Sequence, residues 1–255
     1  MINVIVHGFT GKMGRVICRM LSDDPDLNLS GGVSRSADRI SETFPAFKSL
    51  WDIDVEADVI IDFSTAAAVD GLLDYVEKTL TPVVLCTTGL SDIQKERIKE
   101  VSKKAPIFSS ANMSLGINLI AELLKKAAPV LNKAGFDIEI SERHHNLKID
   151  APSGTAVLLA DAINESLDNG LEYVYDRSQK REKRSKKEIG FQSLRGGTIV
   201  GEHDVVFAGL DEVIEFRHAA FSKEVFGTGA VNAAKFLYNK KPGLYSMSDL
   251  LSDYL

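Results

Sequence analysis

Residues 142–155, "ERHHNLKIDAPSGT", concentrate side chains that can move protons and bind anions. His144 and His145 are adjacent, Lys148 follows, and the Pro-Ser-Gly-Thr sequence is typical of a helix start. A histidine titrates near neutrality and can deliver a proton, while a lysine can hold a carboxylate. The stretch therefore predicts an acid/base site that binds an anion.

The expected helix start supplies a second part of this site. Ser153 is a favourable N-cap, so Gly154 and Thr155 would present free backbone N–H groups to a carboxylate. His144 and His145 end a predicted strand, in which successive side chains point to opposite faces. One imidazole can thus face the substrate while the other makes a separate contact.

A metal site, a serine hydrolase and a purely structural role are the alternatives for this stretch. The chain has five histidines but no H-E-x-x-H motif and no cysteine cluster, which argues against a metal site. "APSGT" is not a G-x-S-x-G nucleophile elbow, which argues against a hydrolase. A structural role for the histidines stays open beside the acid/base site.

The elements that must position these residues begin with alternating strands and helices. Such alternation with short links is typical of βαβ units and predicts a doubly wound parallel sheet, an α/β fold. The expected strands are 2–8, 27–35, 57–64, 81–89 and 106–114, and the expected helices are 12–23, 66–79 and 90–105.

The pattern changes after residue 113 and predicts a second, mixed α+β domain. A helix at 114–131 leads away from the sheet, strand-like segments at 136–145, 189–209 and 211–221 alternate like antiparallel strands, and a long helix lies at 153–167. The closing segment, 227–251, is expected to be helical and to pack on the first domain. We therefore expect a dinucleotide-binding domain at 1–113 and 218–255, and a substrate-binding and oligomerisation domain at 114–217.

A glycine loop joins the first strand to the first helix. In "HGFTGKMGR", Gly8, Gly11 and Gly14 form G-x-x-G-x-x-G, a variant of the dinucleotide fingerprint. Glycine permits a tight turn and close backbone approach, and the helix N-terminus then faces a pyrophosphate. Strand, loop and helix in this order predict a dinucleotide site.

The end of the second strand bears on the choice of dinucleotide. Ser34, Arg35 and Ser36 stand where an NAD enzyme usually offers a carboxylate to the ribose hydroxyls. Arg35 could bind a 2′-phosphate, and Lys12 could supply a second cation. We expect NADPH to bind at least as well as NADH.

The loops at 63–65, 86–89 and 110–113 also follow strands, and their small polar residues suit a nicotinamide and its ribose.

Bulk properties limit the partners. The 255 residues, 44% hydrophobic and 26% charged, fit one large or two modest globular domains, and the net charge of −6 argues against nucleic acid. No apolar stretch is long enough to span a bilayer, no signal peptide is evident, and Cys18 and Cys86 form no CxxC pair, so we expect a cytoplasmic protein. The basic run at 176–187 is either a solvated loop or a source of positive potential near an anionic ligand.

These motifs together resemble one family. "E-x-H-H-x-x-K-x-D-A-P-S-G-T-A", with "GFTGKMGR", "CTTG", "SANMSLGINL" and "RGGTIVGEH", is similar to dihydrodipicolinate reductases, in matching order from residue 4 to about residue 237. The resemblance implies NAD(P)H-dependent reduction in the diaminopimelate route to lysine. It also implies a homotetramer assembled through the second domain.

The resemblance assigns roles to individual residues. His144 would be the proton donor, Lys148 a catalytic and substrate-binding cation, and His145 a substrate contact; Gly154 and Thr155 would hold a substrate carboxylate. The residues that would line the dinucleotide are Gly8, Phe9, Thr10, Gly11, Lys12, Met13, Cys86, Thr87, Thr88, Ser110, Ala111, Asn112 and Met113. Two residues depart from the family pattern: Ser34 replaces a frequent acidic residue, and Cys86 a frequent glycine.

Two other functions stay open at this point. A different two-domain NADPH reductase of an amino or keto acid would share the glycine loop. So would a non-catalytic, dinucleotide-sensing regulator, which would not need the His/Lys stretch.

Overall fold

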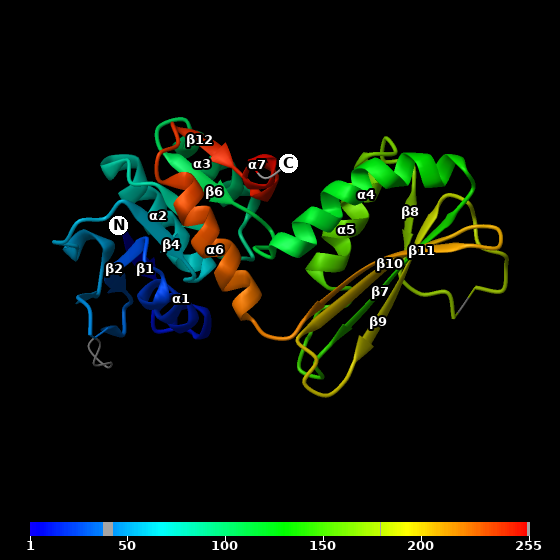
Figure 1. Cartoon of the computed structure of the whole chain (residues 1–255), viewed down its shortest axis with the longest axis horizontal. Coiled ribbons are helices and arrows are strands. Elements are labelled where there is room, and N and C mark those ends of the chain that lie inside the picture. The colour runs from blue at the N-terminus through cyan, green and yellow to red at the C-terminus, as the bar shows by residue number, and fades with distance from the viewer. Residues whose placement is uncertain (38–42, 179, 254–255) are drawn as a thin grey trace. The chain divides into compact units, whose positions relative to one another are not determined.

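The computed structural model describes residues 1–37, 43–178 and 180–253, which form two compact units (Figure 1). Unit 1 comprises Met1–Ser114 and Glu224–Leu255, and unit 2 comprises Leu115–Lys223. The expected second boundary, at residue 218, falls inside strand β11 (Val213–Ala220). That strand pairs with β10 (Gly201–Ala208) along its whole length and so belongs entirely to unit 2.

Unit 1 contains a seven-stranded sheet in the order β12-β6-β5-β4-β1-β2-β3, in which every pair is parallel. This confirms the predicted doubly wound α/β fold. The strands are β1 (Ile2–His7), β2 (Leu27–Val33), β3 (Ala46–Phe47), β4 (Val59–Asp62), β5 (Val83–Leu85), β6 (Pro106–Ser109) and β12 (Gly243–Tyr245).

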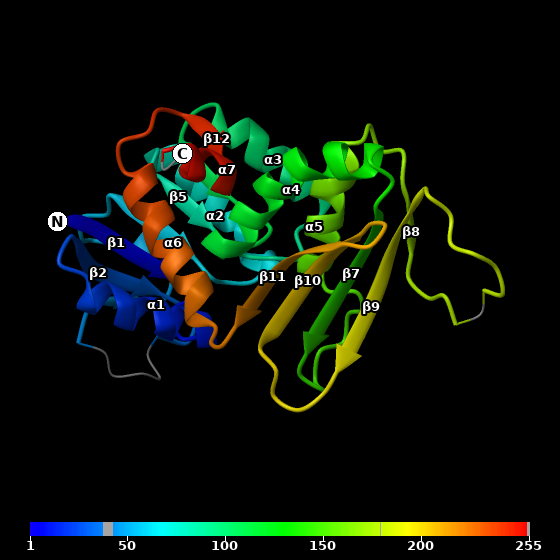
Figure 2. The same ribbon diagram turned by 45° about the vertical axis from the view of Figure 1, so that its right-hand side comes forward.

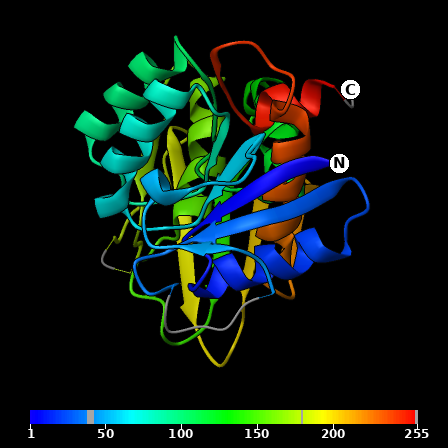
Figure 3. The same cartoon turned by 90° about the vertical axis from the view of Figure 1, so that its left-hand side faces the viewer.

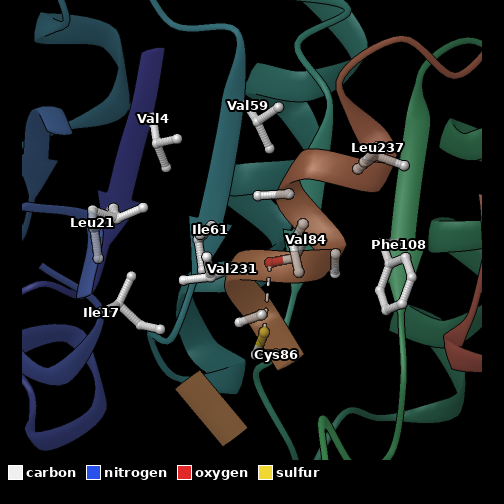
Figure 4. Packing of buried hydrophobic residues seen from close by; sticks show 14 of the residues in the cluster. Val4, Ile17, Leu21, Val59, Ile61, Val84, Cys86, Phe108, Val231 and Leu237 are labelled. Carbon is white, nitrogen blue, oxygen red and sulfur yellow. Dashed lines mark hydrogen bonds between the residues drawn. The ribbon is translucent and has the colours of Figure 1, made fainter. Parts of the chain in front are cut away.

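Helices cover both faces of this sheet, as Figure 3 shows. They are α1 (Lys12–Asp23), the 3₁₀ helix η2 (Leu50–Asp52), α2 (Ala66–Thr79), α3 (Asp92–Ser102), α6 (Glu224–Leu237) and α7 (Met247–Ser252). One core joins α1, α6 and α7 to side chains such as Val4, Ile61 and Phe108 (Figure 4), and the other joins α2 and α3 to Ile5 and Ile60. Since neighbouring residues of a central strand are buried on opposite faces, its sequence reads as a continuous apolar run.

Unit 2 contains a five-stranded mixed sheet in the order β11-β10-β7-β9-β8. Its other elements are α4 (Leu115–Lys133), β7 (Asp137–His144), α5 (Gly154–Glu165), β8 (Glu172–Val174) and β9 (Glu188–Arg195). Helices α4 and α5 pack on one face of the sheet (Figure 2), where Ile140, Phe191 and Phe207 are among the buried residues. Burial alternates along β7, which places Glu142 and His144 on the face that carries the core.

The structure corrects the sequence prediction at several elements. The strands of unit 2 are not all antiparallel, because β9 runs parallel to both β7 and β8. The closing segment is not wholly helical, because β12 adds a parallel strand beside β6. Strands β3, β8 and β12 were not predicted; they are only two or three residues long, too short for a visible period. Within the described residues, no helix is long and apolar enough to cross a membrane.

A matched pair of glycine substitutions tests the packing of the glycine loop against α1. An added Cβ at Gly14 would lie 2.2 Å from the carbonyl oxygen of Gly8, whereas one at Gly71 in α2 would meet nothing within 4 Å. We expect Gly14→Ala to lower the free energy of unfolding by about 1–3 kcal/mol through overpacking. Gly71→Ala should raise it by about 0.5–1 kcal/mol through reduced backbone entropy. Urea unfolding of the two variants gives the comparison, and equal effects would contradict it.

Candidate active site

In unit 1, the glycine loop forms one wall of a cavity of about 420 Å³ at the carboxyl ends of the strands. Gly8 has φ +84°, and a Cβ there would lie 2.5 Å from the carbonyl oxygen of Phe63. Any side chain at Gly8 would therefore clash with the backbone just after β4, and the loop could not pass so close to it. Gly11 is the N-cap of α1, whose first turn contains no acidic residue, so the helix N-terminus is open to an anion.

The cavity contains some of the predicted dinucleotide residues and several that were not predicted. Gly8, Thr10, Gly11, Ser34 and Arg35 line it, together with Ser36. The loop at 63–65, which the sequence assigned to the dinucleotide, also lines it. The unpredicted lining residues are His7, Val33, Lys48, Ser49, Leu50, Trp51, Ala68 and Gly71. Residues 48–51 were missed because they follow β3, a strand of only two residues.

Three hydroxyl groups meet at the end of β2. Thr10 Oγ1 and Ser34 Oγ lie 2.8 Å apart, and Ser36 Oγ lies 3.2 Å from Ser34 Oγ. This cluster replaces the carboxylate that would face ribose hydroxyls in an NAD enzyme. It adds no negative charge to repel a phosphate, and the exposed Arg35 follows it directly.

The other predicted dinucleotide residues do not line this cavity. Phe9 is buried in the core of unit 1 and packs edge-on against Phe44, so only its backbone can meet a ligand. Lys12 is exposed at the start of α1, and Met13 is half-buried beside it. Thr88 and Ala111 are exposed in their loops, after β5 and β6.

A buried carboxylate organises the loop after β5. Asp62 is fully buried, accepts a hydrogen bond from Thr87 Oγ1 at 2.6 Å, and lies 2.8 Å from His7 Nδ1. Burial, with the nearby charge of Asp62, raises the pKa of the Cys86 thiol well above its ordinary value. The hydroxyl of Thr87 thus donates its hydrogen bond to a buried carboxylate of the protein. The Cys86 thiol stays protonated and neutral, and its side chain serves to pack the interior.

The loop after β6 is held by its own hydrogen bonds. Ser110 Oγ donates to the carbonyl oxygen of Asn112 at 2.8 Å, and the side-chain oxygen of Asn112 accepts from the amide of Ser114 at 2.8 Å. Asn112 and Met113 are buried, so this turn has a fixed shape at the carboxyl end of the strand.

In unit 2, Glu142 is the centre of the His144 site. Its carboxylate is almost completely buried, and His144 Nδ1 lies 2.5 Å from its Oε2 atom. Arg195 on β9 donates from Nη1 to Oε2 at 2.8 Å and from Nη2 to Oε1 at 2.7 Å. The amide of Ser153 donates to Oε1 at 3.1 Å. One carboxylate therefore joins β7, β9 and the start of α5.

The contact with Glu142 sets the tautomer of His144. An ionised carboxylate only accepts hydrogen bonds, so Nδ1 must carry the proton, and Nε2 is left for chemistry. The ring also packs edge-on against His203, with centroids 5.1 Å apart. His203 Nε2 lies 2.9 Å from Ser153 Oγ, which in turn accepts from the amide of Ala156 as the N-cap of α5. His144 and the helix start are thus parts of one hydrogen-bonded assembly.

The charges of this assembly follow from burial and from Arg195. Burial alone would raise the pKa of Glu142, but hydrogen bonds from Arg195, Ser193 and His144 lower it to about 2. Burial lowers the pKa of His144, and Lys148 and Arg195 lower it further against the opposing effect of Glu142. Burial lowers the pKa of His203 to about 3. At neutral pH the free protein thus has an ionised Glu142 beside a mostly neutral His144.

The remaining predicted residues lie in the loop between β7 and α5. The amide of Lys148 donates to the carbonyl oxygen of His145 at 3.1 Å, and Lys148 Nζ pairs with Asp150 at 2.8 Å. His145 is half-buried. Gly154 is exposed and Thr155 half-buried at the start of α5, whose first turn contains no acidic residue. The backbone amide of Gly154 contacts the carboxylate of Asp150, so the start of α5 already binds an anionic group of its own loop.

The basic run at 176–187 pairs with acidic side chains of its own unit. Arg177 and Lys180 lie against Glu188, and Arg184 and Lys186 pair with Asp137. Arg184 also donates to the carbonyl oxygens of Ile138 and Glu188. These contacts hold Arg177 and Arg184 against the end of the sheet, while the other described residues of the run are exposed. Residue 179 lies outside the described residues.

Comparisons with known proteins identify the family. Residues 2–113 match the model for "Dihydrodipicolinate reductase, N-terminus", and residues 116–251 match "Dihydrodipicolinate reductase, C-terminus". The chain belongs to the dihydrodipicolinate reductase family. The predicted resemblance is therefore confirmed over both units.

Relatives of this family match almost the whole chain. The 4-hydroxy-tetrahydrodipicolinate reductase of Caldanaerobacter subterraneus subsp. tengcongensis is 52% identical over 98% of this chain and 98% of that protein. That of Clostridium botulinum is 49% identical over 98% of both chains. Among solved structures, a dipicolinate-bound dihydrodipicolinate reductase from Paenisporosarcina sp. TG-14 has a TM-score of 0.79, with 23% identity over 96% of this chain and 97% of that chain. This last likeness shows the shared fold.

The low pKa of Glu142 predicts a specific loss of stability in acid. A carboxylate with a depressed pKa in the folded state stabilises fully above its ordinary value of 4.5, and this contribution is lost as the pH falls toward 2. Between pH 6 and pH 3 we expect the wild type to lose about 2 kcal/mol more unfolding free energy than Glu142→Gln. Urea unfolding across this range measures the difference. Glu100→Gln, at an exposed position on α3, is the control and should follow the wild-type curve; parallel curves for wild type and Glu142→Gln would contradict the expectation.

Proposed function

We propose that this protein is an NAD(P)H-dependent reductase that converts 4-hydroxy-tetrahydrodipicolinate, or dihydrodipicolinate, to tetrahydrodipicolinate in the diaminopimelate route to lysine. The observation that carries the proposal is the Glu142–His144 pair beside the start of α5, which combines a positioned proton donor with a carboxylate site. Membership of the family and the names of the relatives support it.

The cofactor site of the proposal is the cavity of unit 1. The residues there fit a dinucleotide. Gly8 lets the loop pass close to the backbone of Phe63, both residues line the cavity, and the N-terminus of α1 is open to a pyrophosphate. When bound, NAD(P)H supplies the hydride. The loops at Cys86–Thr88 and Ser110–Met113, at the carboxyl ends of β5 and β6, would hold the nicotinamide half through their backbones.

The substrate is a cyclic, unsaturated dicarboxylate, and unit 2 supplies its anion contacts. Gly154 and Thr155 would bind one carboxylate at the start of α5, where backbone amides and the helix dipole favour negative charge. Lys148 would bind the other. Asp150 contacts both Lys148 Nζ and the amide of Gly154, and the substrate carboxylates would replace it at both groups. His145, the neighbour of the proton donor, would make a further substrate contact.

His144 is the proposed proton donor, through Nε2. Because burial lowers its pKa, the His144 imidazole is mostly neutral in the free protein. A dicarboxylate nearby favours the cationic imidazole, because an opposite charge within a few ångströms stabilises the charged form. Substrate binding would therefore favour protonation of His144. The imidazole would then deliver this proton to the carbon that hydride addition has left electron-rich. Glu142 stabilises this cation without taking the proton.

An enzyme assay tests the proposal directly. Oxidation of NADPH, followed by absorbance, should require dihydrodipicolinate freshly generated from its precursors. A protein that binds NADPH but leaves this substrate unreduced would reject the proposed reaction and favour another reductase or a dinucleotide sensor.

Replacing the proton donor should separate chemistry from cofactor binding. We expect His144→Ala to lower kcat by about 10²–10⁴-fold, the usual contribution of one general acid. The dissociation constant of NADPH should stay unchanged, because the cavity is lined by residues of unit 1. His218→Ala, on β11 of the same sheet, is the control histidine and should keep kcat within about threefold. An unchanged kcat in His144→Ala would exclude His144 as the acid.

We further propose that NADPH is preferred and that Arg35 binds its 2′-phosphate. The hydroxyl cluster of Thr10, Ser34 and Ser36 and the presence of Lys48 in the cavity support this. Arg35→Ala should weaken NADPH binding by about tenfold, as expected for one charge-assisted hydrogen bond, and NADH binding by much less. Arg19→Ala, which removes an ion pair with Glu224 on α6, is the matched control. A dissociation constant of the wild type that is tenfold lower for NADH than for NADPH would contradict the proposed preference for NADPH.

The proposed assembly is a homotetramer in the cytoplasm, without nucleic-acid or membrane partners. We propose the face of the unit 2 sheet opposite α4 and α5 as the assembly surface; charged side chains on it are paired with one another. Arg143 pairs there with Asp204 at 2.6 Å, and Arg217 pairs with Glu202 at 3.3 Å. Sedimentation of the purified protein would measure the number of copies.

A further inference from the structure

Trp51 is the single tryptophan of the chain, and its side chain is unusually exposed for its size. It is 53% exposed and lines the cavity of unit 1 together with the glycine loop. Large aromatic side chains are usually covered, since each buries a large apolar area on packing. The exposed lining of this cavity is more apolar than polar, so its wall, with the indole, suits a flat ligand that has an apolar face.

The position of Trp51 is fixed before any ligand arrives. Its backbone amide donates to Ser49 Oγ at 3.3 Å, and Ser49 and Asp52 form a capping box around the 3₁₀ helix η2. The indole packs against Tyr75, with ring centroids 5.2 Å apart, and Lys78 Nζ lies 5.1 Å from its centroid. A ring held in this way loses little freedom when a ligand packs on it.

The sheet order gives the direction of a dinucleotide along this cavity. Strands β1, β2 and β3 are neighbours and parallel, so their carboxyl ends form a row. The glycine loop at the end of β1 suits phosphates, and the hydroxyls at the end of β2 suit a ribose. The next group along the row is the base, and Trp51 lies just after β3.

We propose that Trp51 is the contact surface for the adenine base of the cofactor, with Lys48 beside it in the same wall. The inference rests on the proposed function, because it takes the ligand to be an adenine dinucleotide. A purine presents a flat π-face, and stacking of a base on an aromatic side chain is a strong contact that needs no hydrogen-bond pattern.

The fluorescence of the single tryptophan provides a direct test on the full-length protein. Adenosine 2′,5′-bisphosphate, which contains the adenosine end but no nicotinamide, should quench Trp51 saturably. Oxidised nicotinamide mononucleotide, which lacks adenosine and does not absorb where tryptophan emits, should not. Trp51→Ala should weaken NADPH binding by about tenfold, equal to about 1.4 kcal/mol, and Trp51→Phe by no more than about threefold.

Leu244→Ala is the matched control for loss of an exposed apolar side chain. Leu244 is 45% exposed and lies on β12, at the opposite edge of the sheet from β3. Its variant should bind NADPH as the wild type does. Circular dichroism checks that each variant is folded; if Trp51→Ala is not, the quenching by adenosine 2′,5′-bisphosphate and the affinity of Trp51→Phe decide.

The outcomes distinguish the inference from the proposed function. In one outcome, the wild type binds and oxidises NADPH while the adenosine probe causes no quenching and Trp51→Ala keeps its affinity for NADPH. This result would overturn the role of Trp51 but not the proposed reductase activity. A wild type that binds neither probe nor NADPH would overturn both.

Discussion

The ionised carboxylate of Glu142 is the interaction on which unit 2 depends. A charge buried to this extent is costly unless it is paired and hydrogen-bonded, and here Arg195, His144 and the amide of Ser153 supply the partners. These partners come from a neighbouring strand, the same strand and a helix start. The need to satisfy one carboxylate therefore brings the imidazole and the proposed anion site into a fixed relation, and it settles which ring nitrogen holds the structural proton.

Unit 1 follows a different constraint, the close approach of backbone to backbone. Gly8 and Gly14 let the loop, the end of β4 and α1 come closer than any side chain would permit. The result is a cavity whose wall combines main-chain and hydroxyl groups with apolar side chains such as Leu50 and Trp51, and which the cations Arg35 and Lys48 also line. Such a wall suits phosphates and ribose, since amide and hydroxyl groups bind them without adding negative charge. Each unit thus contributes a site whose form follows from one local requirement.

Much of this fold could be predicted from residue patterns. Helices α1 and α2 begin and end where the predicted segments did, because their apolar periodicity and flanking residues are strong local signals. The direction of β9 could not be predicted, since strand pairing depends on contacts distant in sequence. The same applies to the charge of the site: His144 and Lys148 were recognised from their spacing, but Arg195 lies 53 residues from Glu142 and no local pattern joins them. Trp51 was not predicted because β3, the strand before it, has only two residues and shows no periodic pattern in the sequence.

The position of Cys86 has a consequence for the chemistry that the protein can tolerate. Only a thiolate reacts readily with electrophiles and oxidants, and burial beside Asp62 keeps this sulfur in the protonated thiol form. Alkylating reagents and mild peroxide should therefore spare the loop after β5, even though a sulfur atom stands at its first residue. The cysteine fills space there much as a small aliphatic side chain would.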